Sequence, residues 1–162
     1  MIKKVIAALA VASAAVLAQG LALPTSADVL ANPDCQNNHG YQTVVKTAPV
    51  IATDGSGARV GTVELCREGS LYFGFVIYNQ AMTASQYAHG YLERYHNGGW
   101  VGIVACYDVA GGGNGRVEPG QRRCWTANLN GDSTAYTFVA SSSQFSSHTG
   151  SLLASGATAN AR

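Results

Sequence analysis

Short apolar runs separated by turn-forming residues characterise the chain from residue 41 to residue 140. Residues 41–52 are rich in β-branched side chains, and the turn cluster TDGSGA follows them. Residues 60–66 alternate between two sets of side chains, which is the period of a strand. In LYFGFVIYN, residues 71–79, apolar side chains fall on both sides of the pleat. This pattern predicts a central strand that is covered on both faces.

The segment AMTASQYAHGYLERYHNGGW, residues 81–100, fits two interpretations. As a helix it would begin at a capping box, Thr83 to Gln86, and would stack its tyrosines at four-residue spacing. As a strand it would place on one face the side chains of Tyr87, His89, Tyr91, Glu93 and Tyr95. Asn97-Gly98 would then form the hairpin turn into the next strand. The strand is favoured, because tyrosine is common in strands and Asn-Gly in hairpin turns.

Three more strands complete the predicted sheet, over residues 100–107, 123–129 and 134–140. From residue 141 the chain is rich in Ser, Ala and Gly. We predict a mobile tail over 141–162, because so little apolar surface does not offset the entropy of ordering. Residues 28–140 then form one domain of six to seven short strands. This spacing of strands and turns is typical of an all-β fold, a small antiparallel sandwich or barrel.

The first 27 residues have the layout of a secretory signal peptide, with Lys3 and Lys4, a long apolar run and a small-residue exit. Cleavage after Ala27 is favoured, and cleavage after Ala22 is the alternative. A retained membrane anchor is the other interpretation, since the apolar run almost reaches spanning length. No second apolar run of that length follows. We therefore expect a secreted, extracellular domain that is free of the membrane after cleavage.

The charge of the chain excludes one class of partner. Without Lys3 and Lys4 there are eight basic residues against nine acidic ones, a formal charge of −1. A protein that neutralises many phosphates is basic, so we predict no nucleic-acid partner. Charged residues are only 12% of the chain, and its solubility depends on Ser, Thr, Asn, Gln and Gly.

Four cysteines follow the predicted signal peptide: Cys35, Cys66, Cys106 and Cys124. An even number in an exported chain predicts two disulfides, with three possible pairings. We favour Cys35–Cys66 and Cys106–Cys124, and pairings that cross these remain open. The second bridge would close a loop at its base, which chain-entropy estimates value at about 3 kcal/mol. No C-x-x-C spacing occurs, and no metal site is predicted.

The glycine-dense stretch GGGNGRVEPGQRRCW, residues 111–125, suggests a phosphate-binding loop at first sight. It lacks the lysine and the Ser/Thr of a Walker loop, and Pro119-Gly120 prevents a following helix. The better interpretation is a loop over 108–123 that its flanking cysteines clamp, so that it loses less entropy when it docks. It would offer to a partner Arg116, Val117, Glu118, Arg122 and Arg123. The alternative is a long hairpin excursion without a binding role.

The tyrosine-rich face of the predicted strand is the second candidate surface. Eight tyrosines and two tryptophans are many for a chain of this length. Amphipathic rings exposed in a row suit stacking on sugar rings or contact with a protein. The candidate binding residues are Tyr87, Tyr91 and Tyr95. The alternative is that these rings cover the core under one sheet.

Evidence for catalysis is sparse, and we predict no catalytic residue and no cofactor. The motifs H-E-x-x-H and G-x-S-x-G are absent. Glu64 and Glu93 lie on predicted strands and could face one another as the paired carboxylates of a glycoside hydrolase, but nothing in the sequence sets their geometry.

Three stretches, GARVGTVELC, YLERYHNGGWVG and PGQRRCW, carry a resemblance. With them the chain resembles a family of small exported β-domains of high-GC Gram-positive, actinobacterial bacteria. The G-x-x-x-G-T-V-E-L run over 57–65 is the most characteristic part, and the likeness covers residues 43–139. The resemblance implies a secreted bacterial β-domain, and it assigns no catalytic or binding residue.

These observations predict a secreted, non-catalytic binding module whose partner is an extracellular protein or a polysaccharide. The favoured version presents the clamped loop to a protein, as a protease inhibitor would present Arg116-Val117 to an active site. A cell-wall or polysaccharide binder that uses the tyrosine face is the alternative. A small secreted hydrolase is the second alternative. The sequence does not indicate the oligomeric state.

Overall fold

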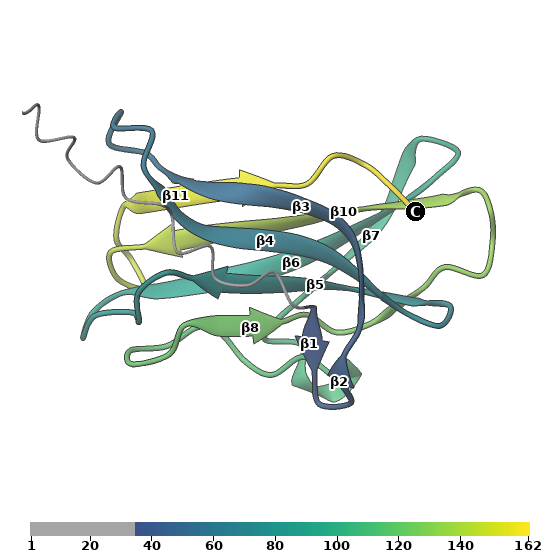
Figure 1. The fold of residues 1–162 in the computed structure, drawn as a ribbon, viewed down its shortest axis with the longest axis horizontal. Coiled ribbons are helices and arrows are strands. Elements are labelled where there is room, and N and C mark those ends of the chain that lie inside the picture. The colour runs from purple at the N-terminus through teal and green to yellow at the C-terminus, as the bar shows by residue number, and fades with distance from the viewer. Residues whose placement is uncertain (1–34) are drawn as a thin grey trace, which may run out of the picture.

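Residues 43–78 form three long neighbouring strands, as their alternating pattern predicts. In the computed structural model, which describes residues 35–162, β3 (Thr43–Ala52), β4 (Arg59–Glu68) and β5 (Leu71–Tyr78) form an antiparallel meander (Figure 1). Side chains pack on both faces of β5, which confirms its central position.

Residues 87–105 form a hairpin and not a helix. β6 (Tyr87–His96) pairs with β7 (Gly99–Ala105). The turn between them places Asn97 at φ 50° and Gly98 at φ 82°, left-handed values that suit an Asn-Gly turn. The capping-box hydrogen bond does form, with the Thr83 N–H donating to Gln86 Oε1 at 3.1 Å, but it closes a turn ahead of β6.

The C-terminal segment belongs to the sheet, so the prediction of a mobile tail over 141–162 is wrong. β10 (Tyr136–Phe145) pairs with β6 along its whole length. β11 (Leu152–Ala157) pairs with β10 on one side. On its other side β11 meets β3 through two residue pairs, Ala154 with Ala52 and Ser155 with Ile51. The ordered domain therefore extends well past residue 140.

Small side chains in this segment allow close packing. Ser142 is buried, and its hydroxyl lies 2.8 Å from the Tyr78 hydroxyl and donates to the His89 carbonyl oxygen at 3.0 Å. A Cβ at Gly156 would clash with the carbonyl of Pro49 on β3. Backbone pairing and close contact order this segment, although its apolar area is small.

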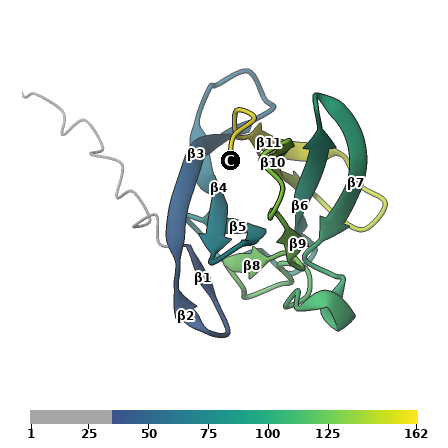
Figure 2. The same ribbon diagram turned by 90° about the vertical axis from the view of Figure 1, so that its right-hand side faces the viewer.

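The main sheet has nine strands in the order β7-β6-β10-β11-β3-β4-β5-β8, with β9 (Leu129–Asn130) also on β5. Every pairing in it is antiparallel. The sheet curls into a half-barrel, so that β3 and β4 lie across from β6 and β7 (Figure 2). The predicted all-β antiparallel class is confirmed. The described residues form eleven strands where six to seven were expected, and four of the eleven have only two or three residues.

The strand expected over 123–129 is interrupted. β8 (Arg123–Trp125) and β9 both pair with β5, and Thr126 lies between them. The Thr126 hydroxyl accepts a hydrogen bond from the Gly74 N–H at 2.9 Å, and the Thr126 N–H donates to the Gly74 carbonyl at 2.9 Å. The Thr126 hydroxyl thus takes the place of a backbone carbonyl in the ladder, and both the N–H and the carbonyl of Gly74 have hydrogen-bond partners on this edge of β5.

Two apolar clusters form the core. The main one fills the inside of the curl with side chains from both halves, among them Val63, Leu65, Leu92, Phe138 and Ala140. A smaller cluster lies on the outer side of β5, where Phe73 and Phe75 pack with the Cys35–Cys66 disulfide, Ile77 and Trp125.

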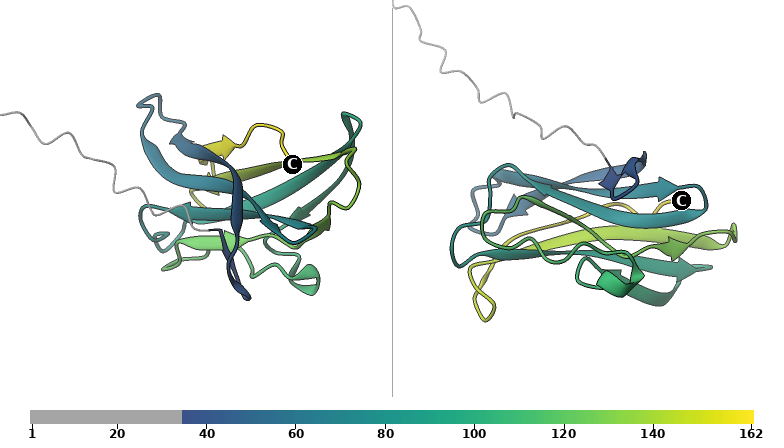
Figure 3. Two further views of the ribbon diagram at one scale, coloured as in Figure 1. Left: turned by 45° about the vertical axis from the view of Figure 1, so that its right-hand side comes forward. Right: turned by 90° about the horizontal axis from the view of Figure 1, so that it is seen from below.

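Both favoured disulfides are present. Cys35–Cys66 anchors the small hairpin of β1 (Gln36–Asn37) and β2 (Gly40–Tyr41), which projects at the side of the half-barrel (Figure 3). Cys106 directly follows β7 and Cys124 lies in β8, so the second disulfide joins the two edge strands of the main sheet. Both of its cysteines are fully buried. We call this covalent junction of the two edges the seam.

The signal peptide expected over residues 1–27 lies outside the described residues. Within 35–162, no helix is long and apolar enough to cross a bilayer. The two disulfides are consistent with an oxidising, extracellular setting.

Candidate binding site

The loop between the seam cysteines folds back onto the sheet, whereas the sequence predicted an excursion into solvent. Val117 pairs with Ala88 of β6 through two backbone hydrogen bonds of 3.0 Å. The Val117 side chain is fully buried in the main core. The prediction that Val117 is offered to a partner is therefore wrong. This bonded backbone also argues against a protease inhibitor that presents Arg116-Val117, because that peptide bond would have to be exposed.

Docking of the loop carries Arg116 to the tyrosine-rich face, so the two candidate surfaces meet in one place. The Arg116 guanidinium carbon lies 5.1 Å from the ring centroid of Tyr107 and 6.0 Å from that of Tyr87. Both distances suit cation–π contact. Tyr107 follows Cys106 directly, so the disulfide fixes its backbone beside β6. The sequence predicts neither this contact nor the role of Tyr107.

Tyr87 forms the buried base of this arrangement. Its ring stacks on His148 at a centroid distance of 4.3 Å and on Phe145 at 5.3 Å. It also meets the His89 ring edge-on at 4.9 Å. Only 7% of Tyr87 is exposed, so this tyrosine supports its neighbours and offers little surface to a ligand.

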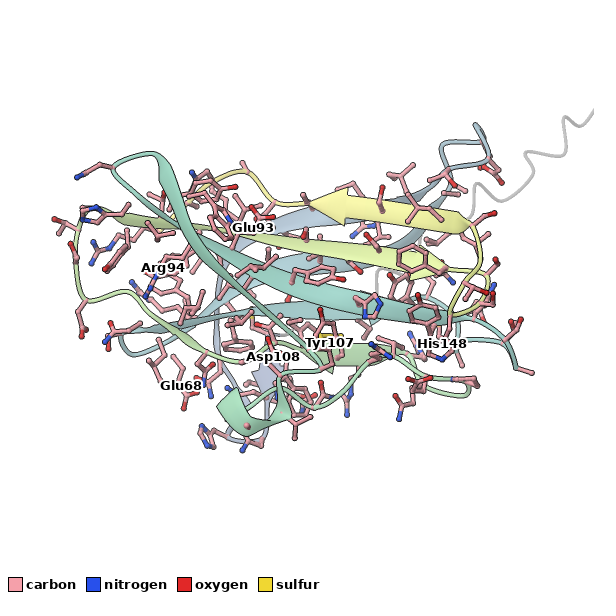
Figure 4. The ribbon with its side chains drawn as sticks, turned by 180° about the vertical axis from the view of Figure 1, so that it is seen from behind. Glu68, Glu93, Arg94, Tyr107, Asp108 and His148 are labelled. Carbon is pink, nitrogen blue, oxygen red and sulfur yellow. A yellow bond between two sulfur atoms is a disulfide. The ribbon has the colours of Figure 1, made fainter. Side chains whose placement is uncertain are left out.

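Tyr91 and Tyr107 are the tyrosine rings of this arrangement that reach solvent, and His148 is exposed beside Tyr87. The centroid of the His89 ring lies 5.7 Å from that of Tyr91 and 5.4 Å from that of Tyr107, and the centroids of the two tyrosine rings are 6.3 Å apart. Tyr91 is half-buried and Tyr107 is 44% exposed. In Figure 4, His148 lies toward one end of the sheet and Arg94 toward the other, with Tyr107 between them. We call this set the aromatic site: Tyr87, His89, Tyr91, Tyr107, Arg116, Phe145 and His148.

Small side chains flank Tyr91 on the neighbouring strands. Residues directly opposite in an antiparallel pair point to the same face. Tyr91 is opposite Ala105 on β7 and Ser141 on β10, and Ser141 is opposite Ala157 on β11. Burial, together with the neighbouring Tyr107, raises the pKa of the Tyr91 hydroxyl, which therefore keeps its proton. The Tyr91 ring therefore projects beside small side chains, and its protonated hydroxyl is able to donate a hydrogen bond.

His89 is held neutral inside this arrangement. Only 7% of the residue is exposed, and no described residue forms a hydrogen bond to its Nδ1. Burial lowers the pKa of His89 to about 4, with smaller contributions from the positive charges of Arg116 and His148. At neutral pH the imidazole therefore acts as an uncharged ring among the tyrosines.

Acidification is expected to destabilise the domain through His89. The pKa of His89 is lower in the folded protein than the ordinary value of 6.5, so the unfolded chain binds its proton more tightly. Stability is then lost as the pH falls from 6.5 to 4, by up to about 3 kcal/mol. His89→Phe keeps a ring in place and removes the titration. Urea unfolding at pH 7 and pH 4 should show a smaller acid loss in His89→Phe than in the wild type, and equal losses would contradict the assignment. His96→Phe, at the exposed end of β6, is the matched control.

Tyr95 lies on the same strand but outside the aromatic site. Its hydroxyl donates a hydrogen bond to the Glu93 carboxylate, and this bond raises the pKa of Tyr95. Opposite it on β7 lies Trp100, which is 58% exposed. Tyr95 therefore extends the aromatic surface toward the other end of the hairpin.

The charged residues of the clamped loop separate into two places. The Glu118 carboxylate lies 4.0 Å from His148 Nε2, at the rim of the aromatic site. Arg122 and Arg123 are exposed on the other side, where the loop returns to β8. Arg116 alone of the three predicted arginines contacts the tyrosines.

The two carboxylates of the hydrolase alternative do not meet. Glu64 is fully buried and lies opposite Phe75, on the side of β4 that carries Cys66. Glu93 lies on β6, and β10, β11 and β3 separate that strand from β4. Among the described residues, one group of metal-ligand types lies together, Cys35, Glu64 and Cys66. Its two cysteines are joined to one another and have no thiolate to offer a metal.

Sequence reasoning missed Tyr107, Phe145 and His148. Tyr107 falls between a predicted strand and the glycine-rich loop, and the other two lie in the segment that was predicted to be mobile. The register of β10 on β6 places Phe145 opposite Tyr87. The alternation of aromatic residues in β6 is the signal that found Tyr87, His89 and Tyr91, and the clamped loop supplied Arg116.

Searches of protein-family models, of curated proteins and of solved structures find no match for this chain. The resemblance to exported actinobacterial β-domains stays a prediction. Function is therefore argued from the site alone.

Proposed function

We propose that the chain is an extracellular, non-catalytic binding domain whose ligand is a polysaccharide bound at the aromatic site. The observation that carries this proposal is the grouping of Tyr91, Tyr107 and Arg116 on the outer face of the half-barrel. Its two disulfides and the signal peptide expected at its N-terminus support a place outside the cell.

The chemistry of the site suits a sugar chain. A pyranose ring has apolar C–H faces that stack on aromatic rings, and hydroxyl groups around its edge that need hydrogen-bond partners. Tyr91 and Tyr107 offer ring faces and hydroxyl groups. Ser141 and Ser143 of β10 offer further hydroxyl groups beside the tyrosine row, because they lie opposite Tyr91 and His89. The Arg116 guanidinium and, at the rim, the Glu118 carboxylate add charged hydrogen-bond partners to these rings and hydroxyls.

Pull-down on insoluble polysaccharides tests the proposal. The wild-type domain is incubated with cellulose, chitin, xylan and purified cell wall, and the retained fraction is measured. We expect retention on at least one of them, and we expect Tyr91→Ala and Tyr107→Ala to weaken it about tenfold or more, as for the loss of a central aromatic contact.

Tyr41→Ala is the matched control, because Tyr41 is 73% exposed on β2 and lies away from the aromatic site. Thermal unfolding of each variant separates lost binding from lost structure. Retention by Tyr91→Ala and Tyr107→Ala equal to that of Tyr41→Ala would overturn the proposal, and so would the absence of retention of the wild type on every polysaccharide.

A protein partner is the second candidate. Strand β7 is an edge of the main sheet, and three of its apolar side chains are about half exposed. These are Trp100, Val101 and Ile103. Exposed apolar residues on an edge strand favour contact with another protein. If Ile103→Ser is no longer retained on the cell wall while Tyr91→Ala is retained like the wild type, the contact lies on β7, and this candidate is selected.

A further inference from the structure

A hollow of about 470 Å³ lies on the outer side of β5 and β8, apart from the aromatic site. We call it the β8 pocket. Its volume is within the range of small-molecule sites. It is lined by Ile77, Asn114, Gly120, Gln121, Arg122, Arg123 and Trp125.

Two guanidinium groups line this pocket, and neither forms a salt bridge within residues 35–162. Arg122 Nε donates to the Tyr78 carbonyl oxygen at 2.9 Å, and Arg123 Nη1 donates to Gln36 Oε1 at 2.5 Å. These bonds hold both side chains in place. No Asp or Glu among residues 35–162 lies within salt-bridge distance of either arginine. The pocket therefore carries two positive charges with unused donor groups.

The two amide side chains in the pocket keep their NH₂ donors unused. Asn114 Oδ1 accepts a hydrogen bond from the Trp125 N–H at 2.7 Å. Gln121 Oε1 accepts one from the Glu118 N–H at 3.1 Å. A backbone N–H can meet only the oxygen end of an amide, so both NH₂ groups remain for a ligand. Every polar side chain that lines the pocket thus offers N–H groups, and each of the two amide oxygens already accepts a backbone hydrogen bond.

The remaining wall of the pocket is apolar. The Trp125 indole N–H donates to the Gly112 carbonyl at 3.0 Å, so the indole presents its ring and not its donor. Ile77 lies beside it, opposite Arg123 in the ladder between β5 and β8. A ligand here meets a flat apolar surface next to a set of donors.

We infer that the β8 pocket binds a small organic anion, a carboxylate carried on a ring-sized apolar body. The carboxylate takes the two arginines and the amide donors, because planar guanidinium groups match carboxylate oxygens. The ring packs on Trp125 and Ile77. This inference is independent of the polysaccharide proposal, since the two sites share no residue.

Binding of benzoate to the wild-type domain tests the inference. The chain has two tryptophans, and a Trp100→Phe variant assigns their two indole N–H signals in an NMR spectrum. We expect benzoate to shift the Trp125 signal in a saturable way. Benzamide, which has the same ring without the charge, should bind about tenfold more weakly or worse.

Variants separate charge from structure. Arg122→Gln with Arg123→Gln should weaken benzoate binding about tenfold or more, and the pair of lysine substitutions should restore part of it. Arg67→Gln, an exposed arginine on β4, should leave binding unchanged. The signals of the aromatic site report whether the fold is intact in each variant.

Three outcomes overturn the inference: an unmoved Trp125 signal at saturating benzoate, equal binding of benzamide, and full binding in the double glutamine variant. Inorganic phosphate that binds as tightly as benzoate contradicts the role given to Trp125 and Ile77. None of these outcomes bears on polysaccharide retention, so the two proposals fail separately.

Discussion

Replacing Cys106 and Cys124 together by alanine is expected to lower the free energy of unfolding by about 3–5 kcal/mol. The disulfide joins β7 to β8, the two edges of the sheet, so its loss frees the seam as well as the loop. Loop closure alone contributes about 3 kcal/mol in chain-entropy estimates. Both sulfur atoms are fully buried, and their removal also leaves a cavity.

Urea unfolding measures the decrease in the free energy of unfolding, and hydrogen exchange shows which part of the protein is destabilised. The amides of Ala88 and Val117 bond each other's carbonyls across the seam, so their exchange should become about tenfold faster or more. Alanine at Cys35 and Cys66 is the comparison, because that bridge anchors the β1–β2 hairpin and should leave these two amides protected. A loss below about 1 kcal/mol, or unchanged exchange at Val117, would show that the seam does not depend on its disulfide.

Gly90→Ala is expected to cost about 2–3 kcal/mol. A Cβ at this position of β6 would lie 2.8 Å from Cys106 Sγ and 2.8 Å from Val76 Cγ2. The seam disulfide thus packs directly on a backbone that has no side chain. Neither neighbour can move freely, because one is part of the disulfide and the other is buried in β5.

Gly102→Ala on the neighbouring strand is the matched control, since a Cβ there meets nothing within 4 Å. It should change stability by less than about 0.5 kcal/mol. With Cys106 and Cys124 both replaced by alanine, Gly90→Ala should cost about 1 kcal/mol less than in the wild type, because its sulfur neighbours are gone. Equal stability of Gly90→Ala and Gly102→Ala would show that the atoms around residue 90 move to accept a Cβ without lowering the free energy of unfolding, and would contradict this prediction.

The long strands could be predicted because their signals are local. Alternation in 60–66 and the Asn97-Gly98 turn depend on a few adjacent residues, and the structure reproduces them. Of the three possible disulfide pairings, the structure has the one that the sequence analysis favoured. The ordered C-terminal strands could not be predicted from composition, because Ser142 is buried by partners on β5 and β6 and Gly156 packs closely on β3.

The candidate site was predictable only in part. The tyrosines of β6 share a face because of their spacing, which the sequence shows. The position of Arg116 depends on the pairing of Val117 with Ala88, a contact between segments far apart in the chain. The apolar character of Val117, placed next to two charged residues, was the one indication that this part of the loop turns inward.

Because the disulfide joins the two edges of the sheet covalently, the exposed side chains between Tyr107 and Arg116 are not needed to hold the edges together. The 3₁₀ turn in this stretch, η1 (Val109–Gly111), buries no residue. Asn114 bonds the Trp125 N–H and Gly113 is buried against Cys106, so sequence variation is open at the exposed positions Val109 and Ala110 and not along the whole stretch. One scaffold can in this way carry a repertoire of specificities, much as a graft site does in an engineered binder.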